Sequence, residues 1–212
     1  MGTSVGHSAI PALIVMSAVL ATAGCAEGNP LEDPTAEGQS YSQRLESYLE
    51  EAESGGASET QISNLREAQE AGEVPYETMR AAIQRAVECM TEAGLAASIV
   101  DETRASGLEI PMYRASHGDE IDTKTGWELI RTCEESESYW LSAAYQQQPR
   151  ARELLVGFVQ SKEEELRECL SENGVETDDN SDGWDLATLA LEHMGAEQDG
   201  FDCLGAVGID GL

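Results

Sequence analysis

The stretch VPYETMRAAIQRAVECMTEAG, residues 74–94, decides the fold class of this chain. Its apolar side chains recur every three or four positions, which places them along one face of an α-helix. These residues are Tyr76, Met79, Ile83, Val87 and Met90. Pro75 near the beginning and Gly94 at the end are residues that commonly open and close a helix. The stretch therefore predicts one long amphipathic helix with an apolar face to bury.

The end of this helix belongs to a phrase that occurs three times in the chain. An acidic residue precedes a cysteine, Met or Leu follows the cysteine, and a glycine stands five positions after it. The copies are ECMTEAG at residues 88–94, ECLSENG at residues 168–174 and DCLGAVG at residues 202–208. In the first two copies the glycine is expected to take the left-handed conformation that ends a helix. The repetition suggests two helical units, residues 74–148 (unit A) and residues 149–212 (unit B).

Helical spacing also dominates the rest of the chain after residue 40. Two polar, glutamate-rich stretches on either side of Gly55 and Gly56 predict a polar helical hairpin over residues 41–73. Further helices are expected at residues 125–146, 150–173 and 184–194.

One segment departs from the helical period. Two short apolar runs, residues 95–101 and 108–113, flank the sequence ETRASG and predict a small β-hairpin near residues 95–113. Pro111 would confine its strand to the edge of a sheet. The expected fold is therefore mainly α, with one or more disulfide-linked helical domains and a small β-hairpin.

The N-terminal part of the chain has the composition of an export signal. Residues 9–24 are almost all apolar or small, and about 16 such residues are too few for a spanning helix, which needs roughly 20. Thr22, Ala23 and Gly24 precede Cys25. This segment resembles the lipobox of bacterial lipoproteins, in which small residues before a lipidated cysteine admit the signal peptidase. The resemblance implies that residues 1–24 are a signal peptide and that Cys25 is lipidated.

A diacylglyceryl cysteine anchors stably because it carries two acyl chains. The residues after Cys25 are rich in Gly, Pro and acids, so residues 25–40 are expected to be the lipidated cysteine and a disordered spacer. The protein would then lie on the outer face of the cytoplasmic membrane, held there by its lipid. Ordinary secretion and an uncleaved signal anchor are the alternatives.

The remaining cysteines are even in number. An even set in an oxidising compartment favours two disulfides, although sequence alone leaves three pairings open. We favour pairing in chain order, Cys89 with Cys133 and Cys169 with Cys203. Each bond would contribute roughly 4 kcal/mol in the chain-entropy model. A metal site or a redox pair is the alternative, although the chain contains no CxxC motif.

The chain is strongly acidic, with 41 Asp and Glu against 12 Lys and Arg and a formal net charge of -29. Such a surface repels nucleic acid and anionic lipid headgroups, so neither is expected as a partner. It would attract basic protein faces, cationic peptides or divalent cations. The alternative explanation is that the charge only keeps the protein soluble. The acidic composition and the helix-ending cysteine phrase resemble small lipoproteins of high-GC Gram-positive bacteria. That resemblance implies a surface location and no particular activity.

One acidic segment has the spacing of a metal loop. The sequence DDNSDG, residues 178–183, places Asp178, Asn180 and Asp182 at alternate positions, as in the first half of a calcium loop. Leu189 stands where such a loop carries its bidentate acid. An acidic turn that caps the next helix explains the same residues more simply. Calcium is thus the one cofactor that the sequence suggests.

No motif of a metalloprotease, a phosphate-binding loop or a serine acyl enzyme lies after Cys25. His117 and His193 are expected at the surface or at helix caps. Four aromatic residues could stack on cell-wall sugars, although helical spacing favours the core for them. They are Trp127, Tyr139, Trp140 and Trp184.

We therefore expect a noncatalytic binding or accessory module of the cell envelope, with an envelope or membrane protein as its partner. A cell-envelope hydrolase that uses carboxylate chemistry is one alternative. A calcium-binding surface protein is the other.

Overall fold

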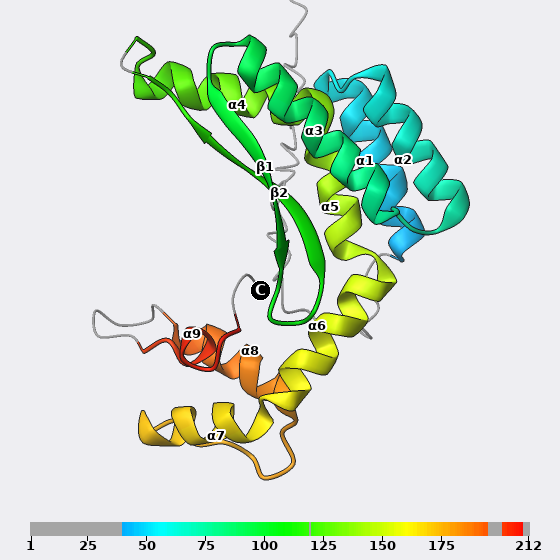
Figure 1. The fold of residues 1–212 in the computed structure, drawn as a ribbon. Helices are drawn as coiled ribbons and strands as arrows, with labels where there is room; N and C mark the ends of the chain where they lie inside the picture. The colour runs from blue at the N-terminus through cyan, green and yellow to red at the C-terminus, as the bar shows by residue number, and fades with distance from the viewer. Residues whose placement is uncertain (1–39, 119, 195–200, 210–212) are drawn as a thin grey trace, which may run out of the picture.

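The structure is a computed structural model that describes residues 40–118, 120–194 and 201–209 (Figure 1). Its elements are α1 (Tyr41–Gly55), α2 (Glu59–Ala71), α3 (Tyr76–Glu92), β1 (Ala96–Thr103), β2 (Glu109–Ser116), α4 (Thr123–Glu137), α5 (Tyr139–Gln147), α6 (Pro149–Ser161), α7 (Glu163–Glu172), α8 (Gly183–His193) and α9 (Cys203–Ala206). The predicted mainly α fold with one small β-hairpin is confirmed. The predicted signal peptide, Cys25 and the spacer up to residue 39 lie outside the described residues. Within the described ranges, no helix has both the length and the apolar character that crossing a membrane requires.

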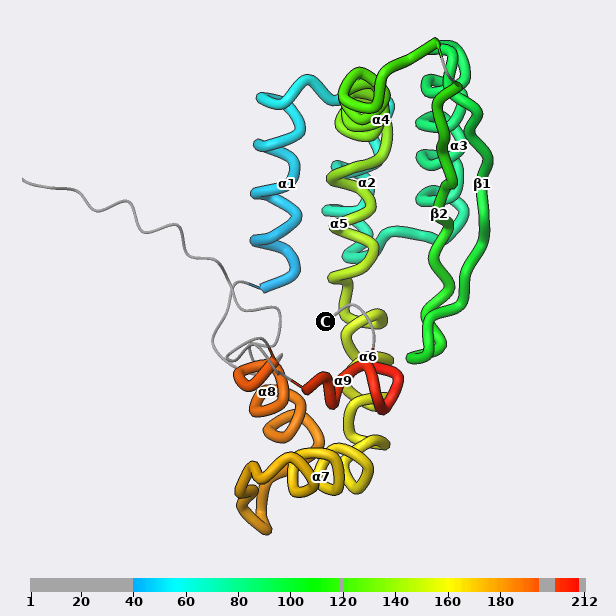
Figure 2. Tube along the Cα trace, turned by 90° about the vertical axis from the view of Figure 1, so that its left-hand side faces the viewer, coloured from blue at the N-terminus to red at the C-terminus, as the bar shows by residue number. Residues whose placement is uncertain are grey.

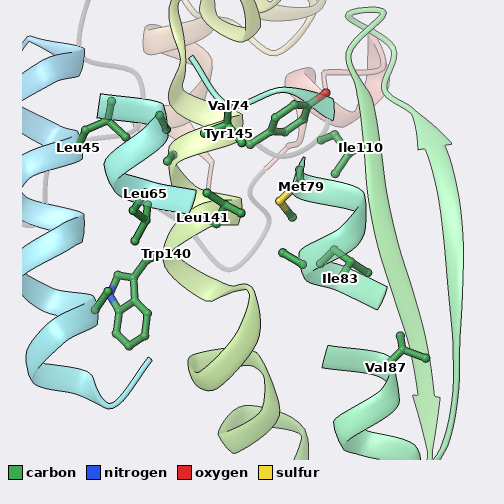
Figure 3. Packing of buried hydrophobic residues seen from close by; sticks show 14 residues of the cluster. Leu45, Leu65, Val74, Met79, Ile83, Val87, Ile110, Trp140, Leu141 and Tyr145 are labelled. Atoms are coloured by element: carbon green, nitrogen blue, oxygen red, sulfur yellow. The ribbon is translucent and has the colours of Figure 1, made fainter. Parts of the chain in front are cut away.

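Helix α5 is the centre of an upper lobe, residues 41–147. Figure 3 shows its side chains between those of α1 and α2 on one side and those of α3 on the other. The buried residues of this core include Leu45, Leu65, Met79, Ile83, Trp140 and Leu141. The predicted polar hairpin, residues 41–73, therefore forms α1 and α2 and shares its core with α3 and α5.

The single helix expected over residues 125–146 is wrong, because the chain breaks at Ser138 into α4 and α5. Ser138 has a φ of -144° and a ψ of -21°, outside helical geometry. The break leaves the last carbonyl groups of α4 and the first N–H groups of α5 without helical partners. Since the site is buried, those groups need partners from elsewhere.

The amide of Gln61, on α2, fills this break. Its side chain is fully buried. Its Nε2 donates to the carbonyl oxygens of Glu135 and Ser136 at 3.0 and 2.8 Å. Its Oε1 accepts from the backbone N–H groups of Trp140 and Leu141 at 3.1 and 3.3 Å. One side chain therefore satisfies two helix ends at once, which explains why the helix breaks where its own sequence gives no signal.

The β-hairpin lies along α3 (Figure 2). Its strands pair antiparallel from Ala96 opposite Ser116 to Thr103 opposite Glu109. They form a two-stranded sheet, so each strand is an edge, as Pro111 predicts. The Tyr76 hydroxyl of α3 donates to the Asp101 carboxylate of β1 at 2.7 Å. This hydrogen bond is the main reason why the pKa of Tyr76 rises to about 12.

A lower lobe, residues 149–209, has its own core and follows the upper lobe through α6 (Figures 1 and 2). The single helix expected over residues 150–173 is wrong, since the chain breaks at Lys162 into α6 and α7. The start of α8 packs on the end of α6, where the Gly183 N–H donates to Gln160 Oε1 at 3.2 Å. A Cβ on Gly183 would lie 2.6 Å from the Val159 carbonyl oxygen. The break and this close contact bring α7 and α8 together around one core.

The repeated cysteine phrase forms the same helix end in all three places. The N–H of the residue after the glycine donates to the carbonyl oxygen of the residue after the cysteine. These bonds join Leu95 to Met90 at 2.9 Å, Val175 to Leu170 at 2.9 Å and Ile209 to Leu204 at 2.8 Å. The three glycines have φ values between 77° and 90°, as this type of cap requires. The prediction for the first two copies is confirmed, and the third copy ends α9, a helix too short to show a period.

Disulfides join Cys89 to Cys133 and Cys169 to Cys203, with a Cα–Cα distance of 5.7 Å in each pair. The predicted pairing in chain order is confirmed. The first bond links α3 to α4 in the upper lobe, and the second links α7 to α9 in the lower lobe. Each disulfide therefore lies within one lobe.

Candidate functional site

A shallow groove of about 590 Å³ lies on α4, at the end of the upper lobe. Its volume falls in the range of roughly 300–1,000 Å³ that is typical of ligand sites. The lining residues are Lys124, Trp127, Glu128, Arg131, Glu134, Glu135 and Tyr139. All of them except Tyr139 belong to α4, where intervals of three, four and seven place them on one strip of the helix surface. We call this site the α4 groove.

The two aromatic residues of the α4 groove are exposed to solvent. Trp127 is 66% exposed and Tyr139 is 54% exposed, whereas Trp140 and Trp184 are buried. The expectation that these aromatic residues belong to the core is therefore wrong for Trp127 and Tyr139 and confirmed for the other two. Exposed large aromatic residues that share one hollow are typical of binding surfaces.

The reason for the error is the position of Trp127 around the axis of α4. The residues that α4 buries are Gly126, Ile130 and Cys133, at intervals of four and three. A residue next to Gly126 is turned about 100° away from this stripe, so Trp127 faces the groove. The sequence did contain a signal, since Gly126 has the spacing of the apolar stripe formed by Ile130 and Cys133. It was missed because a search for apolar periodicity does not count glycine as apolar.

Several contacts hold the groove in place. Asp122 caps α4, accepting from the Thr125 N–H at 3.1 Å, and hydrogen bonds from Thr125 hold the pKa of Asp122 below its usual value. The disulfide of Cys133 ties the middle of α4 to α3. Burial of Tyr113 of β2, together with the neighbouring Glu134 carboxylate, raises the pKa of Tyr113. The groove is therefore formed by anchored elements rather than by a loop.

The charges of the groove nearly balance. Three carboxylates face two cations, in a chain whose net charge is -29. Lys124 Nζ lies 3.7 Å from Glu128 Oε1. The ring of Tyr139 meets that of Trp140 edge to face, with centroids 5.4 Å apart and an interplanar angle of 89°. The site thus combines two exposed aromatic rings with both donors and acceptors of hydrogen bonds.

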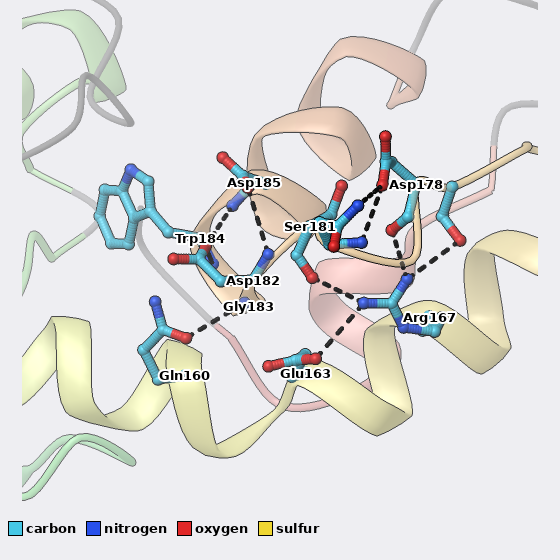
Figure 4. A network of polar contacts seen from close by, with 11 residues as sticks. Gln160, Glu163, Arg167, Asp178, Ser181, Asp182, Gly183, Trp184 and Asp185 are labelled. Carbon is cyan, nitrogen blue, oxygen red and sulfur yellow. Dashed lines mark hydrogen bonds and ion pairs between the residues drawn. The ribbon is translucent and has the colours of Figure 1, made fainter.

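The acidic segment at residues 178–183 is organised by an arginine of α7 (Figure 4). Arg167 Nη1 donates to the carbonyl oxygen of Asp178 at 2.8 Å. Its Nη2 donates to the carbonyl oxygen of Ser181 at 2.6 Å and to the carboxylate of Glu163 at 3.3 Å. The guanidinium group therefore forms hydrogen bonds with two backbone carbonyl oxygens of this turn.

The three predicted calcium ligands have local roles. Asp178 Oδ1 accepts from the backbone and side-chain N–H groups of Asn180, both at 2.8 Å. Asp182 caps α8 by accepting from the N–H groups of Trp184 and Asp185 at 2.9 and 3.0 Å. These bonds lower the pKa of Asp178 and of Asp182. The alternative prediction of a helix cap is confirmed for Asp182.

Other reactive side chains do not gather into a site in the described ranges. His117 is exposed and packs against Gly126, and His193 stacks on Phe201 with ring centroids 6.2 Å apart. No cluster of three His, Cys, Asp or Glu side chains in the described part of the chain is placed to hold a metal ion. In comparisons with known proteins, the chain matches no family model, no curated protein and no solved structure.

Proposed function

We propose that this chain is a lipid-anchored, extracytoplasmic binding module of the cell envelope and that the α4 groove is its binding surface. The observation that carries the proposal is the exposure of Trp127 and Tyr139 in one groove. Trp and Tyr supply much of the binding energy where proteins meet ligands, because they bury a large area at a small entropic cost.

The disulfides support the extracytoplasmic location. Bonds of this kind persist in oxidising compartments and are rare in the cytosol, and all four cysteines of the described lobes are paired. The resemblance of residues 22–25 to a lipobox supports an anchor at Cys25. Together they favour a protein that folds and works outside the cytoplasm.

The position of the groove relative to the N-terminal side also supports a binding role. Helix α1 begins at Tyr41, whose hydroxyl donates to the Ala144 carbonyl oxygen near the end of α5. The other end of α1 leads to Ser58, whose N–H donates to the Ser136 carbonyl oxygen beside α4. A helix of 15 residues spans roughly 22 Å. Helix α4, which carries the groove, therefore lies at the end of α1 opposite Tyr41 (Figure 2).

The carboxylates of the groove favour binding over hydrolysis. A glycosidase of the usual kind needs one carboxylic acid that stays protonated near neutral pH, which requires an apolar surrounding. The Glu128 side chain is 55% exposed and lies beside Lys124, and Glu134 neighbours the Tyr113 side chain. Both carboxylates thus lie beside polar side chains, which suits hydrogen-bonding contacts with a ligand.

Photo-crosslinking in living cells tests the proposal. A photoreactive phenylalanine analogue is placed at position 124, at the groove, and at position 150 on α6 as the control. The side chains of Lys124 and Arg150 are 86% and 70% exposed, so neither substitution disturbs the core. We expect a covalent adduct in the membrane fraction from position 124 and none from position 150. No adduct from position 124, or equal adducts from both positions, would contradict the assignment of the groove.

A further inference from the structure

We infer that the α4 groove binds an uncharged oligosaccharide, with Trp127 and Tyr139 as stacking platforms for its sugar rings. This inference rests on the proposed function and names the chemistry of the ligand. Three properties of the groove carry it: the exposed aromatic side chains, the mixed hydrogen-bonding groups and the charge balance.

The aromatic faces match the apolar faces of sugar rings. The face of an aromatic ring carries the negative part of its quadrupole, and the C–H groups on one side of a pyranose ring carry partial positive charge. Trp127 and Tyr139 are more than half exposed, so their rings are available for this contact. The edge-to-face packing of Tyr139 on Trp140 fixes the orientation of its ring.

The polar groups around the rings match sugar hydroxyls. A hydroxyl both donates and accepts, so a ring with neighbouring hydroxyls is best bound by a planar group that bridges two of them. Arg131 supplies paired donors, and Glu128 and Glu135 supply paired acceptors. An apolar peptide would leave these groups without partners, at a cost in binding free energy.

The charges of the groove argue against charged ligands. A polyanion would be repelled by a chain of net charge -29, and a second copy of the chain would be repelled for the same reason. A basic peptide would be attracted to the molecule as a whole, but in the groove Lys124 and Arg131 offset two of the three carboxylates, so its charge gains little there. A neutral polar ligand is repelled neither by the net negative charge of the chain nor by the cations of the groove.

The length of the groove suits an oligomer. From Trp127 to Glu137, the last residue of α4, the helix rises about 15 Å, and Tyr139 follows the break at Ser138. The two platforms are therefore expected to hold different rings of one chain.

Calorimetric titration of the complete chain tests the inference, with intact disulfides and in a detergent without sugar headgroups. The probe is the uncharged tetramer of N-acetylglucosamine, and a lysine-rich peptide is the comparison. We expect saturable binding of the tetramer that changes little with salt. Trp127→Ala should weaken this binding at least about tenfold, and Tyr139→Ala should weaken it whereas Tyr139→Phe, which keeps the ring, should not.

Met194→Ala is the matched control, because Met194 is an exposed apolar residue in the lower lobe (43% exposed) and its loss should leave binding unchanged. No saturable binding of the tetramer, or binding that Trp127→Ala leaves intact, would overturn the inference. Binding of the lysine-rich peptide in place of the tetramer would also overturn it and would assign the groove to a basic protein segment. If position 124 still forms its adduct in cells, the proposed function stands although the sugar inference fails.

Discussion

The buried amide of Gln61 determines the path of the chain between α4 and α5. It makes four hydrogen bonds with the backbone on both sides of Ser138. No pattern near residue 138 predicts the break, because the residue that stabilises it stands more than seventy positions earlier. A search for periodicity sees only local spacing, so it joined α4 and α5 into one helix.

Replacement of Gln61 by Met, which has a similar shape but no amide, should destabilise the upper lobe. The Glu135 carbonyl group and two N–H groups would lose their partner, whereas the Ser136 carbonyl keeps the hydrogen bond from the Ser58 N–H. Each buried group without a partner costs about 1–3 kcal/mol before relaxation. We expect the free energy of unfolding to fall by about 3 kcal/mol, measured by denaturation in urea. Gln69→Met, at an exposed position of the same helix, is the control and should change it little. Equal effects of the two variants would refute the role of Gln61.

Two glycines of the lower lobe should respond to alanine with opposite signs. At Gly183 a Cβ would lie 2.6 Å from the Val159 carbonyl oxygen, so Gly183→Ala should destabilise by about 1–3 kcal/mol. At Gly157, inside α6, a Cβ meets nothing within 4 Å, so Gly157→Ala should stabilise by up to about 1 kcal/mol. Thermal unfolding of both variants checks this pair. A stabilised Gly183→Ala would show that α6 and α8 are not in close contact.

At the scale of elements, the sequence predicted α3, the hairpin and the helix ends at the cysteine phrases, because these depend on local spacing and turn residues. The breaks at Ser138 and Lys162 were missed because packing partners from other elements stabilise them. The α4 groove was missed for a related reason. A regular period along α4 did not reveal that Gly126, and not Trp127, lies in the core stripe.

The cap of α8 should make stability depend on pH. The folded-state pKa of Asp182 is lowered, chiefly by the hydrogen bond from the Asp185 N–H. A lowered pKa means that the cap stabilises the fold above the unfolded value, about 3.9, and that this contribution is lost as the pH falls through the folded value. Asp182→Asn keeps a good cap without a titrating group.

The melting temperatures of the two proteins at pH 6 and pH 3 provide the measurement. Between these pH values, we expect the original chain to lose more stability than the Asp182→Asn variant does. Equal losses would show that Asp182 does not contribute through its charge.

The disulfides should stabilise the lobes separately. Replacing Cys89 and Cys133 by Ala removes a loop constraint across 44 residues, worth roughly 4 kcal/mol in the chain-entropy model. Since the two lobes have separate cores, we expect hydrogen exchange to accelerate in α3 and α4 and to change little in α7 and α8. Equal acceleration in both lobes would show that they unfold as one unit.

At the scale of the whole molecule, the protein is acidic and two-lobed, and the groove proposed to bind a ligand lies on α4, at the end of α1 opposite Tyr41. The net charge of -29 and the low content of aromatic residues were readable from the sequence. The groove was not, because it depends on how α4 lies against its neighbours. The proposed lipid anchor at Cys25 would hold both lobes at the outer face of the cytoplasmic membrane.

The intact mass of the protein, purified from the membrane fraction of its own cells without reduction, tests that location most directly. We expect a chain that begins at Cys25, carries the mass of a diacylglyceryl group and lacks the four hydrogens that two disulfides remove. Reduction should then restore those four hydrogens and leave the lipid in place. A chain that still contains residues 1–24, or one whose Cys25 carries no lipid, would contradict the proposed anchor.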